Sequence, residues 1–234
     1  MSLISICQNA LKGISGFSIP STFYGNLDAT ASLIVAVANE SGQDLEKEIR
    51  WQELISEHTF ATVIGTATYA LPTGFRAFAD MSQWNRTTLR RLSGPVPSTV
   101  YQWLKSGLTV SAAGRNYFMI RGNLFTIYPT PTAVQTIAFD YYDKRWVTKQ
   151  IDSSFSTSWT ADLDTSRIDE DLITADVKWR FLQAKGMPFE TEYLRYETIK
   201  SLLSGDNGGR DSIRMGGPVA SDGNSNMPDT GYGA

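Results

Sequence analysis

The chain has 234 residues, of which 41% are apolar and 19% charged, enough for one sizeable core or for two smaller ones. Its formal net charge is −3, and its single cysteine, Cys7, excludes an intrachain disulfide and a cysteine-based zinc site. The longest apolar run, 33–38, is too short to cross a bilayer, and the N-terminal residues lack the pattern of a secretion signal, so we expect a soluble protein made in the cytoplasm.

The first elements predicted along the chain are helices. Residues 2–14 have the composition of a short helix. Asp28 is a favourable N-cap for a second helix over 29–49, where apolar residues recur at helical spacing. Gly42 interrupts this second helix and predicts a bend in it.

After residue 58 the pattern becomes that of β-strands. Residues 59–64 and 67–71, joined by a Gly-Thr pair, predict a β-hairpin, and residues 117–120 and 124–128, joined by a Gly-Asn pair, predict another. The remaining elements of this region are a strand at 89–92, a short helix from Pro97 and an alternating strand over 134–142. Together they predict a small antiparallel β-domain.

Helical spacing returns in the last third of the chain. Ser166 is the predicted N-cap, and three acidic residues follow in the first turn, where the helix dipole favours anions. The Lys-Gly pair at 185–186 ends this helix, and Pro188 suits the first position of the next one. The two segments therefore predict a helical hairpin.

These elements predict an α+β fold. Helices from the two ends of the chain form one α-helical bundle, and a small antiparallel β-domain is inserted between them. The predicted divisions are 1–57 for the N-terminal helices, 58–160 for the β-rich insert, 161–204 for the C-terminal helical hairpin and 205–234 for an extended, glycine-rich arm.

The last 31 residues, 204–234, include eight glycines and few bulky apolar side chains. Such a segment cannot offset its ordering entropy by burying a core, so alone we expect it to be disordered. Two roles remain open: the segment folds back on its own domain, or it orders on a partner by strand addition or coupled folding. The candidate anchors of this arm are Arg210, Ile213, Arg214, Met215, Val219 and Tyr232.

Charge is distributed unevenly along the sequence. Residues 28–57 carry seven acidic side chains against two basic ones, whereas residues 58–149 carry ten basic side chains against three acidic ones. Two interpretations remain open: solvated surfaces of opposite sign, or electrostatic complementarity between copies or with a partner. A protein that reads DNA sequence is usually basic overall and carries a recognition motif, and this sequence has neither feature.

Few residues could carry catalysis. His58 is the only histidine, Cys7 has no activating neighbour in the sequence, and the Gly-x-Ser-x-Gly motif is absent. Asp162 and Asp164 could serve glycoside chemistry or bind Ca²⁺, but the calcium-loop spacing is incomplete and helix capping is the simpler role. The glycines of 205–209 lack the strand and lysine of a phosphate loop. We therefore expect no enzyme activity, no cofactor and no metal.

Three segments carry a family resemblance: 33–39 running on to 50–54, then 59–72, and 162–186 with the helix that follows. Over most of residues 28–205 the sequence resembles the head-to-tail adaptor, or head-completion, proteins of short-tailed bacteriophages, a group that includes tail tubular protein A. The resemblance lies in spaced residues and includes no catalytic signature.

The resemblance implies a structural virion protein at the head–tail interface, with no membrane contact. Twelve copies would form a ring that binds the dodecameric portal protein, lets double-stranded DNA pass and docks a tail nozzle or tube protein during assembly and genome ejection. The arm would reach the portal. An acidic channel wall would not bind phosphates, and the candidates for it are Glu46, Glu48, Asp169, Glu170 and Asp171.

Two other functions remain as alternatives. The protein could be a different neck or tail component, such as a stopper, tube or collar, and its position in an imaged particle would identify that role. It could also be a cell-wall-binding or cell-wall-degrading module that uses Asp162, Asp164 or exposed tyrosines. Peptidoglycan turnover that disappeared in an Asp164→Asn variant would identify the enzyme.

Overall fold

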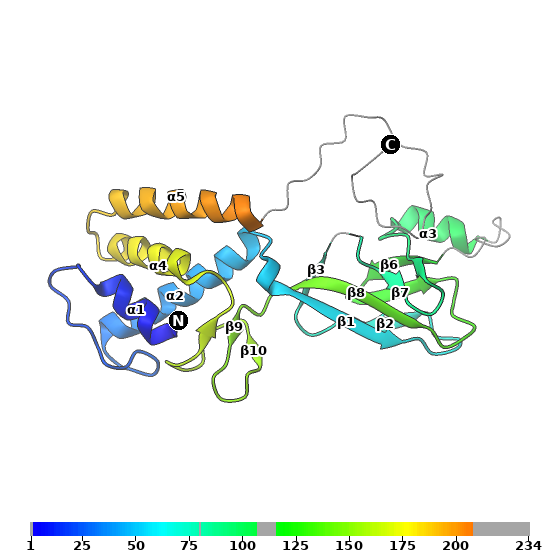
Figure 1. Cartoon of the computed structure of the whole chain (residues 1–234), viewed down its shortest axis with the longest axis horizontal. Helices are drawn as coiled ribbons and strands as arrows, with labels where there is room; N and C mark the ends of the chain where they lie inside the picture. The colour runs from blue at the N-terminus through cyan, green and yellow to red at the C-terminus, as the bar shows by residue number, and fades with distance from the viewer. Residues whose placement is uncertain (1, 80, 107–115, 208–234) are drawn as a thin grey trace. The chain divides into compact units, whose positions relative to one another are not determined.

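The computed structural model describes residues 2–79, 81–106 and 116–207. These residues form two compact units (Figure 1). Unit 1 contains the described residues up to Leu54 together with those from Asp143 onward, and unit 2 contains the described residues of Ile55–Tyr142. Helices and antiparallel sheets are both present, so the predicted mixed α+β fold class is confirmed.

Unit 1 brings together helices from both ends of the chain. Its α-helices are α1 (Leu3–Leu11), α2 (Ala29–Glu48), α4 (Glu170–Ala184) and α5 (Glu190–Asn207). All four share one buried apolar core, to which α5 contributes Tyr196, and α4 packs against each of the other helices. Among the described residues, none of the helices is both long and apolar enough to cross a membrane.

Helix α2 begins where the sequence predicts. The carboxylate of Asp28 accepts hydrogen bonds from the backbone N–H groups of Thr30 and Ala31, at 3.0 and 3.2 Å. Gly42 does not interrupt the helix, which continues through this residue. The indole of Trp146 lies so close that a Cβ at Gly42 would overlap its ring. Glycine is needed here for close packing.

Helix α4 begins three residues later than Ser166 predicts. Asp169 is the N-cap, and its carboxylate accepts a hydrogen bond of 2.9 Å from the backbone N–H of Leu172. Ser166 lies instead in a short strand, and its hydroxyl bonds to the backbone of Ile168. The predicted C-terminal stop is confirmed, because α4 ends just before a Gly186 with φ of +67°.

A small sheet belongs to unit 1. It has the order β10-β9-β11, built from β9 (Val147–Thr148), β10 (Phe155–Ser156) and β11 (Thr165–Ser166). The sequence-based division places 143–160 in the β-insert, whereas this segment packs with the helices. The reason is the side chains of Trp146 and Trp159, which are buried in the helical core with ring centroids 5.1 Å apart.

Unit 2 contains two sheets and one short helix. One sheet has the order β1-β8-β4-β5, with β3 also on β8, and the other has the order β2-β7-β6. The elements are β1 (Ile55–Ala61), β2 (Thr68–Ala70), β3 (Phe75–Phe78), β4 (Trp84–Asn85), β5 (Arg90–Arg91), α3 (Ser98–Lys105), β6 (Tyr117–Arg121), β7 (Leu124–Tyr128) and β8 (Thr136–Asp143). A 3-10 turn, Gln52–Leu54, precedes β1.

The two predicted hairpins have opposite outcomes. The second one is confirmed, because β6 pairs with β7 through a turn whose Gly122 and Asn123 both have positive φ. The first one is wrong, because β1 pairs with β8 and β2 pairs with β7. The loop after β1 leads from one sheet to the other and is held by the hydroxyl of Tyr69, which accepts a hydrogen bond from the backbone N–H of Val63.

Aromatic rings fill the core of unit 2. Phe125 stacks on Phe118 and on Phe139, with ring centroids 4.9 and 5.5 Å apart. All three rings are almost completely buried. This stack joins β6 and β7 of one sheet to β8 of the other.

Candidate functional site

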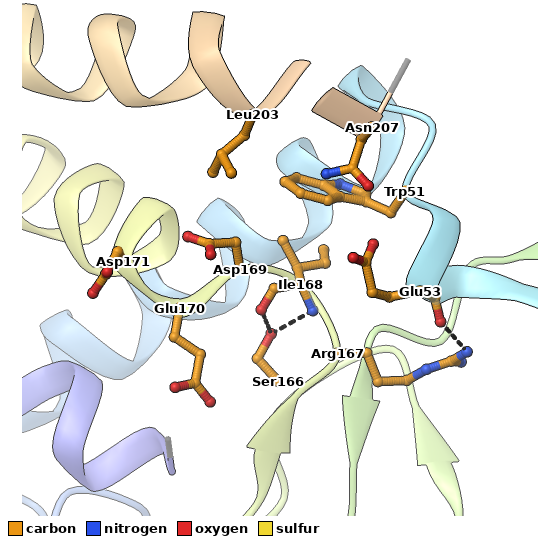
Figure 2. A pocket seen from close by; sticks show the side chains of 10 residues that line it. All are labelled: Trp51, Glu53, Ser166, Arg167, Ile168, Asp169, Glu170, Asp171, Leu203 and Asn207. Carbon is orange, nitrogen blue, oxygen red and sulfur yellow. Dashed lines mark hydrogen bonds between the residues drawn. The ribbon is translucent and has the colours of Figure 1, made fainter. Parts of the chain in front are cut away.

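A hollow of about 390 Å³ lies in unit 1 where α4 begins and α5 ends (Figure 2). Figure 2 shows Leu203 and Asn207 reaching it from α5, Trp51 covering one side, and three acidic side chains at the start of α4. The residues that line the hollow are Trp51, Glu53, Ser166, Arg167, Ile168, Asp169, Glu170, Asp171, Leu203 and Asn207.

Two side chains give this hollow a fixed shape. The indole N–H of Trp51 donates a hydrogen bond of 2.9 Å to the carbonyl of Leu45, near the end of α2. The guanidinium of Arg167 donates to the carbonyl oxygens of Glu53 and Arg145, at 2.6 and 3.1 Å. The ring of Phe155 lies 4.1 Å beneath the guanidinium carbon of Arg167.

The rim of the hollow is acidic. Carboxylates of Glu53, Asp169, Glu170 and Asp171 line it together with the single guanidinium of Arg167. Asp169 is committed to capping α4, whereas Asp171 is exposed in the first turn. Among the described residues, no group of three or more His, Cys, Asp or Glu side chains is arranged to hold a metal ion. The hollow therefore has the charge of a binding surface and no evident catalytic grouping.

The acidic residues predicted to face a channel lie in different environments. Glu46 is only 4% exposed, so its side chain cannot line a channel, and this assignment is wrong. Glu48 forms an ion pair with Lys200 of α5. Asp169, Glu170 and Asp171 come together at the start of α4, on the rim of the hollow. Sequence spacing could not reveal the burial of Glu46, because it depends on how α2 packs.

Part of the acidic stretch 28–57 pairs with basic residues far along the chain. Arg180 of α4 lies 3.0 Å from Asp44, 3.4 Å from Glu40 and 3.0 Å from Asp176. Burial acts to lower the pKa of Arg180, but the carboxylates of Asp176 and Asp44 outweigh burial and raise this pKa. Three of the seven acidic side chains of this stretch, Glu40, Asp44 and Glu48, therefore form ion pairs with α4 or α5 within unit 1.

The carboxylates considered for catalysis bind backbone groups instead. Asp164 accepts hydrogen bonds from Thr160, Ala161 and Gln150, the shortest of them 2.7 Å. Burial acts to raise the pKa of Asp164, but these hydrogen bonds hold it below the usual 3.8. Asp162 accepts from the backbone N–H groups of Phe23 and Tyr24. Both side chains fasten loops to the helical core.

The other two catalytic candidates lie among apolar groups. Cys7 is fully buried in α1, and burial raises the pKa of its thiol to about 12, which leaves it protonated and unreactive. His58 of β1 packs on Phe60 and Phe139, with centroids 5.8 and 5.3 Å away. Burial lowers the pKa of His58. Its ring contacts are those of a packing residue.

The candidate anchors of the C-terminal arm cannot be placed in this geometry. They lie outside the described residues, which end at Asn207 in the last turn of α5: Arg210, Ile213, Arg214, Met215, Val219 and Tyr232. The described chain therefore shows only where the arm begins.

The described residues thus form two compact units, and unit 1 carries an acidic hollow. The model of the SU10 adaptor protein family matches residues 9–216. Because the match covers most of the chain, the protein belongs to the SU10 adaptor protein family and is a phage structural adaptor. No curated protein matches the sequence. The resemblance to phage adaptors is thus confirmed at the level of the family, and the short-tailed group stays a prediction.

Proposed function

We propose that this protein forms the head-to-tail adaptor ring of a phage particle. Twelve copies bind the portal, extend the DNA channel and dock a tail nozzle or tube protein. The observation that carries the proposal is the adaptor-family match over residues 9–216, which includes nearly all the described residues of both units. The site of action is the virion neck.

Exposed apolar side chains support a role in assembly. A ring subunit must contact two neighbours, and interfaces favour exposed apolar and aromatic groups. Unit 1 exposes Leu27 at 98% and Ile151 at 88%, and unit 2 exposes Leu89 at 70% and Ile64 and Val134 at 63% each. These side chains are available to be buried against neighbouring copies or partners.

The environments of the catalytic candidates support a structural role in the same way. Asp162 and Asp164 hold loops, Cys7 is buried and unreactive, and His58 packs against phenylalanines. Each group already has a structural use in the folded chain. We therefore propose that the protein performs no enzymatic step.

The acidic start of α4 is the proposed channel surface. Asp171 is exposed there, next to Glu170 and to Asp169 at the N-cap. Carboxylates on a channel wall repel DNA phosphates, so DNA passes without being held. The arm from residue 208 onward is the proposed contact with the portal.

The direct test uses purified portal rings. The full chain and a chain ending at Asn207 are mixed with portal, and binding is followed by light scattering coupled to size exclusion. We expect the full chain to add twelve copies per portal ring, and the shortened chain to bind much more weakly. A chain with a scrambled 208–234 segment is the matched control and should also bind weakly. If the full chain did not bind to the portal rings, the proposal would be refuted.

A further inference from the structure

Strand β1 has an open edge. It pairs with β8 on one side, and among the described residues no strand lies on its other side. Just beyond the strand, the backbone N–H of Thr62 donates to the carbonyl of Gln135 on the β8 side, at 2.8 Å. Backbone directions alternate along a strand. The N–H groups of Ser56, His58 and Phe60 therefore face β8, and the backbone groups of the alternate residues, 55, 57, 59 and 61, point toward the open side.

The core of unit 2 is also incomplete at this edge. His58 and Phe60 point toward the core face, where they contact Phe139 with ring centroids 5.3 and 6.5 Å away. Both side chains are only partly buried, whereas Phe139 and Ile137 on the neighbouring strand are each 1% exposed. An apolar side chain beside β1 would complete the burial of His58 and Phe60.

The opposite face of the same edge carries excess negative charge. Glu57 on β1 lies directly across from Asp140 on β8. Arg86 makes an ion pair of 2.7 Å with Glu57, and both of these side chains are about half exposed. Burial and the charge of Glu57 raise the pKa of Asp140, with Arg86 acting in the opposite direction. One further cation would balance the pair of carboxylates.

The sequence that follows α5 has the complementary pattern. In Arg210–Met215, the apolar Ile213 and Met215 alternate with Arg214, so a strand would place the two apolar side chains on one face and the cation on the other. The end of α5 lies beside the segment that leads directly into β1, because Asn207 accepts a hydrogen bond of 3.5 Å from the backbone N–H of Gln52, three residues before Ile55. Three extended residues span about 10 Å, enough to reach Ile55 from this point.

We propose that residues 210–215 add as a strand to the open edge of β1 in the same molecule, parallel to it. Ile213 and Met215 lie beside His58 and Phe60, and Arg214 lies on the face of Glu57. The short tether favours the same molecule over a second copy, because it gives a high effective concentration. This inference goes beyond the proposed adaptor role: it fixes the root of the arm on the protein's own sheet and leaves residues 216–234 to reach the portal.

Hydrogen exchange measured by NMR tests the proposal on the isolated chain, without portal. In the full chain we expect the backbone N–H groups of Glu57, Thr59 and Ala61 to exchange at least about tenfold more slowly than in a chain ending at Asn207. The N–H groups of His58 and Phe60 stay protected in both, which shows that unit 2 is folded. Equal exchange of the outward groups in both chains would overturn the proposal.

Matched variants locate the contact. Ile213→Asp combined with Met215→Asp should abolish the protection, whereas Val219→Asp combined with Met227→Asp, equally charged but farther along, should retain it. Loss of protection in the second pair alone would overturn the assignment to 210–215. Protection that falls on tenfold dilution would overturn the same-molecule arrangement. Because no portal is present, failure here is distinct from failure of the adaptor proposal.

Discussion

The two units are stabilised by different means. In unit 1, buried and half-buried charges connect helices and loops: Arg180 links α4 to α2, and Asp164 holds the loop before α4. In unit 2, stacked phenylalanines such as Phe125 and Phe139 connect the two sheets. Charged links depend on particular partners in a fixed geometry, whereas aromatic packing depends on volume and area.

This contrast bears on assembly. Ionic links hold α4 in place within unit 1. The acidic hollow of unit 1 is therefore a preformed surface. Within the described part of the chain, unit 2 has an unpaired edge at β1, the proposed position of residues 210–215, and it exposes aliphatic side chains such as Ile64 and Val134. Partners can therefore contact the exposed aliphatic side chains of unit 2 without disturbing the ionic links of unit 1.

Removing a central ring of unit 2 should have the largest effect. Phe139 is 1% exposed and contacts rings from both sheets, so Phe139→Ala should cost about 4 kcal/mol of unfolding free energy. Hydrogen exchange should show the loss in unit 2, with the helices of unit 1 largely unaffected. Trp103→Ala, at a ring that is 52% exposed in the same unit, is the control and should cost less than about 1 kcal/mol. An equal loss of hydrogen-exchange protection in both units would contradict the account that this aromatic core stabilises unit 2 alone.

Breaking the ionic link of unit 1 should have the second largest effect on stability. Arg180→Met leaves the carboxylate of Asp176, whose side chain is 0% exposed, without its cation, and should cost about 3 kcal/mol in urea unfolding. Arg195→Met removes a side chain that is 67% exposed and should change stability by less than about 0.5 kcal/mol. If the two variants unfolded alike, the ionic link would not stabilise unit 1.

Disturbing the packing between Gly42 and Trp146 should have a smaller effect on stability than breaking the ionic link. A Cβ at Gly42 overlaps the indole, so Gly42→Ala should destabilise unit 1 by about 2 kcal/mol, although alanine is the better helix former. Gly205 on α5 has open space around its Cα, so Gly205→Ala should cause no loss. Thermal unfolding followed by circular dichroism compares the two. A stabilising Gly42→Ala would show that the indole can move away.

The smallest effect should be the pH dependence due to His58. Burial lowers the pKa of His58 in the folded chain below the 6.5 of the unfolded chain. The folded state therefore binds fewer protons, and unit 2 should lose stability as the pH falls below about 6.5. A His58→Gln variant should lack this part of the decline in urea titrations between pH 7 and pH 5. Parallel curves for the two proteins would contradict the assigned pKa direction.

Sequence features that act over a few neighbouring residues predicted the local structure correctly. The Asp28 cap and the hairpin over β6 and β7 both depend on residues within a few positions of each other, and both are confirmed. The Asp169 cap was missed because Ser166 is an equally good capping residue, and only the pairing of β11 with β9 removes it from that role. Local chemistry cannot choose between two suitable residues when distant pairing decides.

Non-local partners were not predictable. Alternation identified β1 as a strand but could not show that Ile55 pairs with Tyr142, far along the chain. The charge of 28–57 suggested an exposed acidic face, because nothing near Asp44 in the sequence indicates Arg180. For the same reason the hollow at the start of α4 could be predicted only in part: its acidic residues were identified, but its contacts with Trp51 and Leu203 were not.

The central claim is that this SU10-family adaptor forms a ring between portal and tail, and one image tests it most directly. Cryo-electron microscopy of the native particle, with this chain fitted into the neck density, should place twelve copies directly beneath the portal. The start of α4 should face the DNA channel. Density for this chain in the tail shaft, in a collar around the neck or outside the particle would contradict the account.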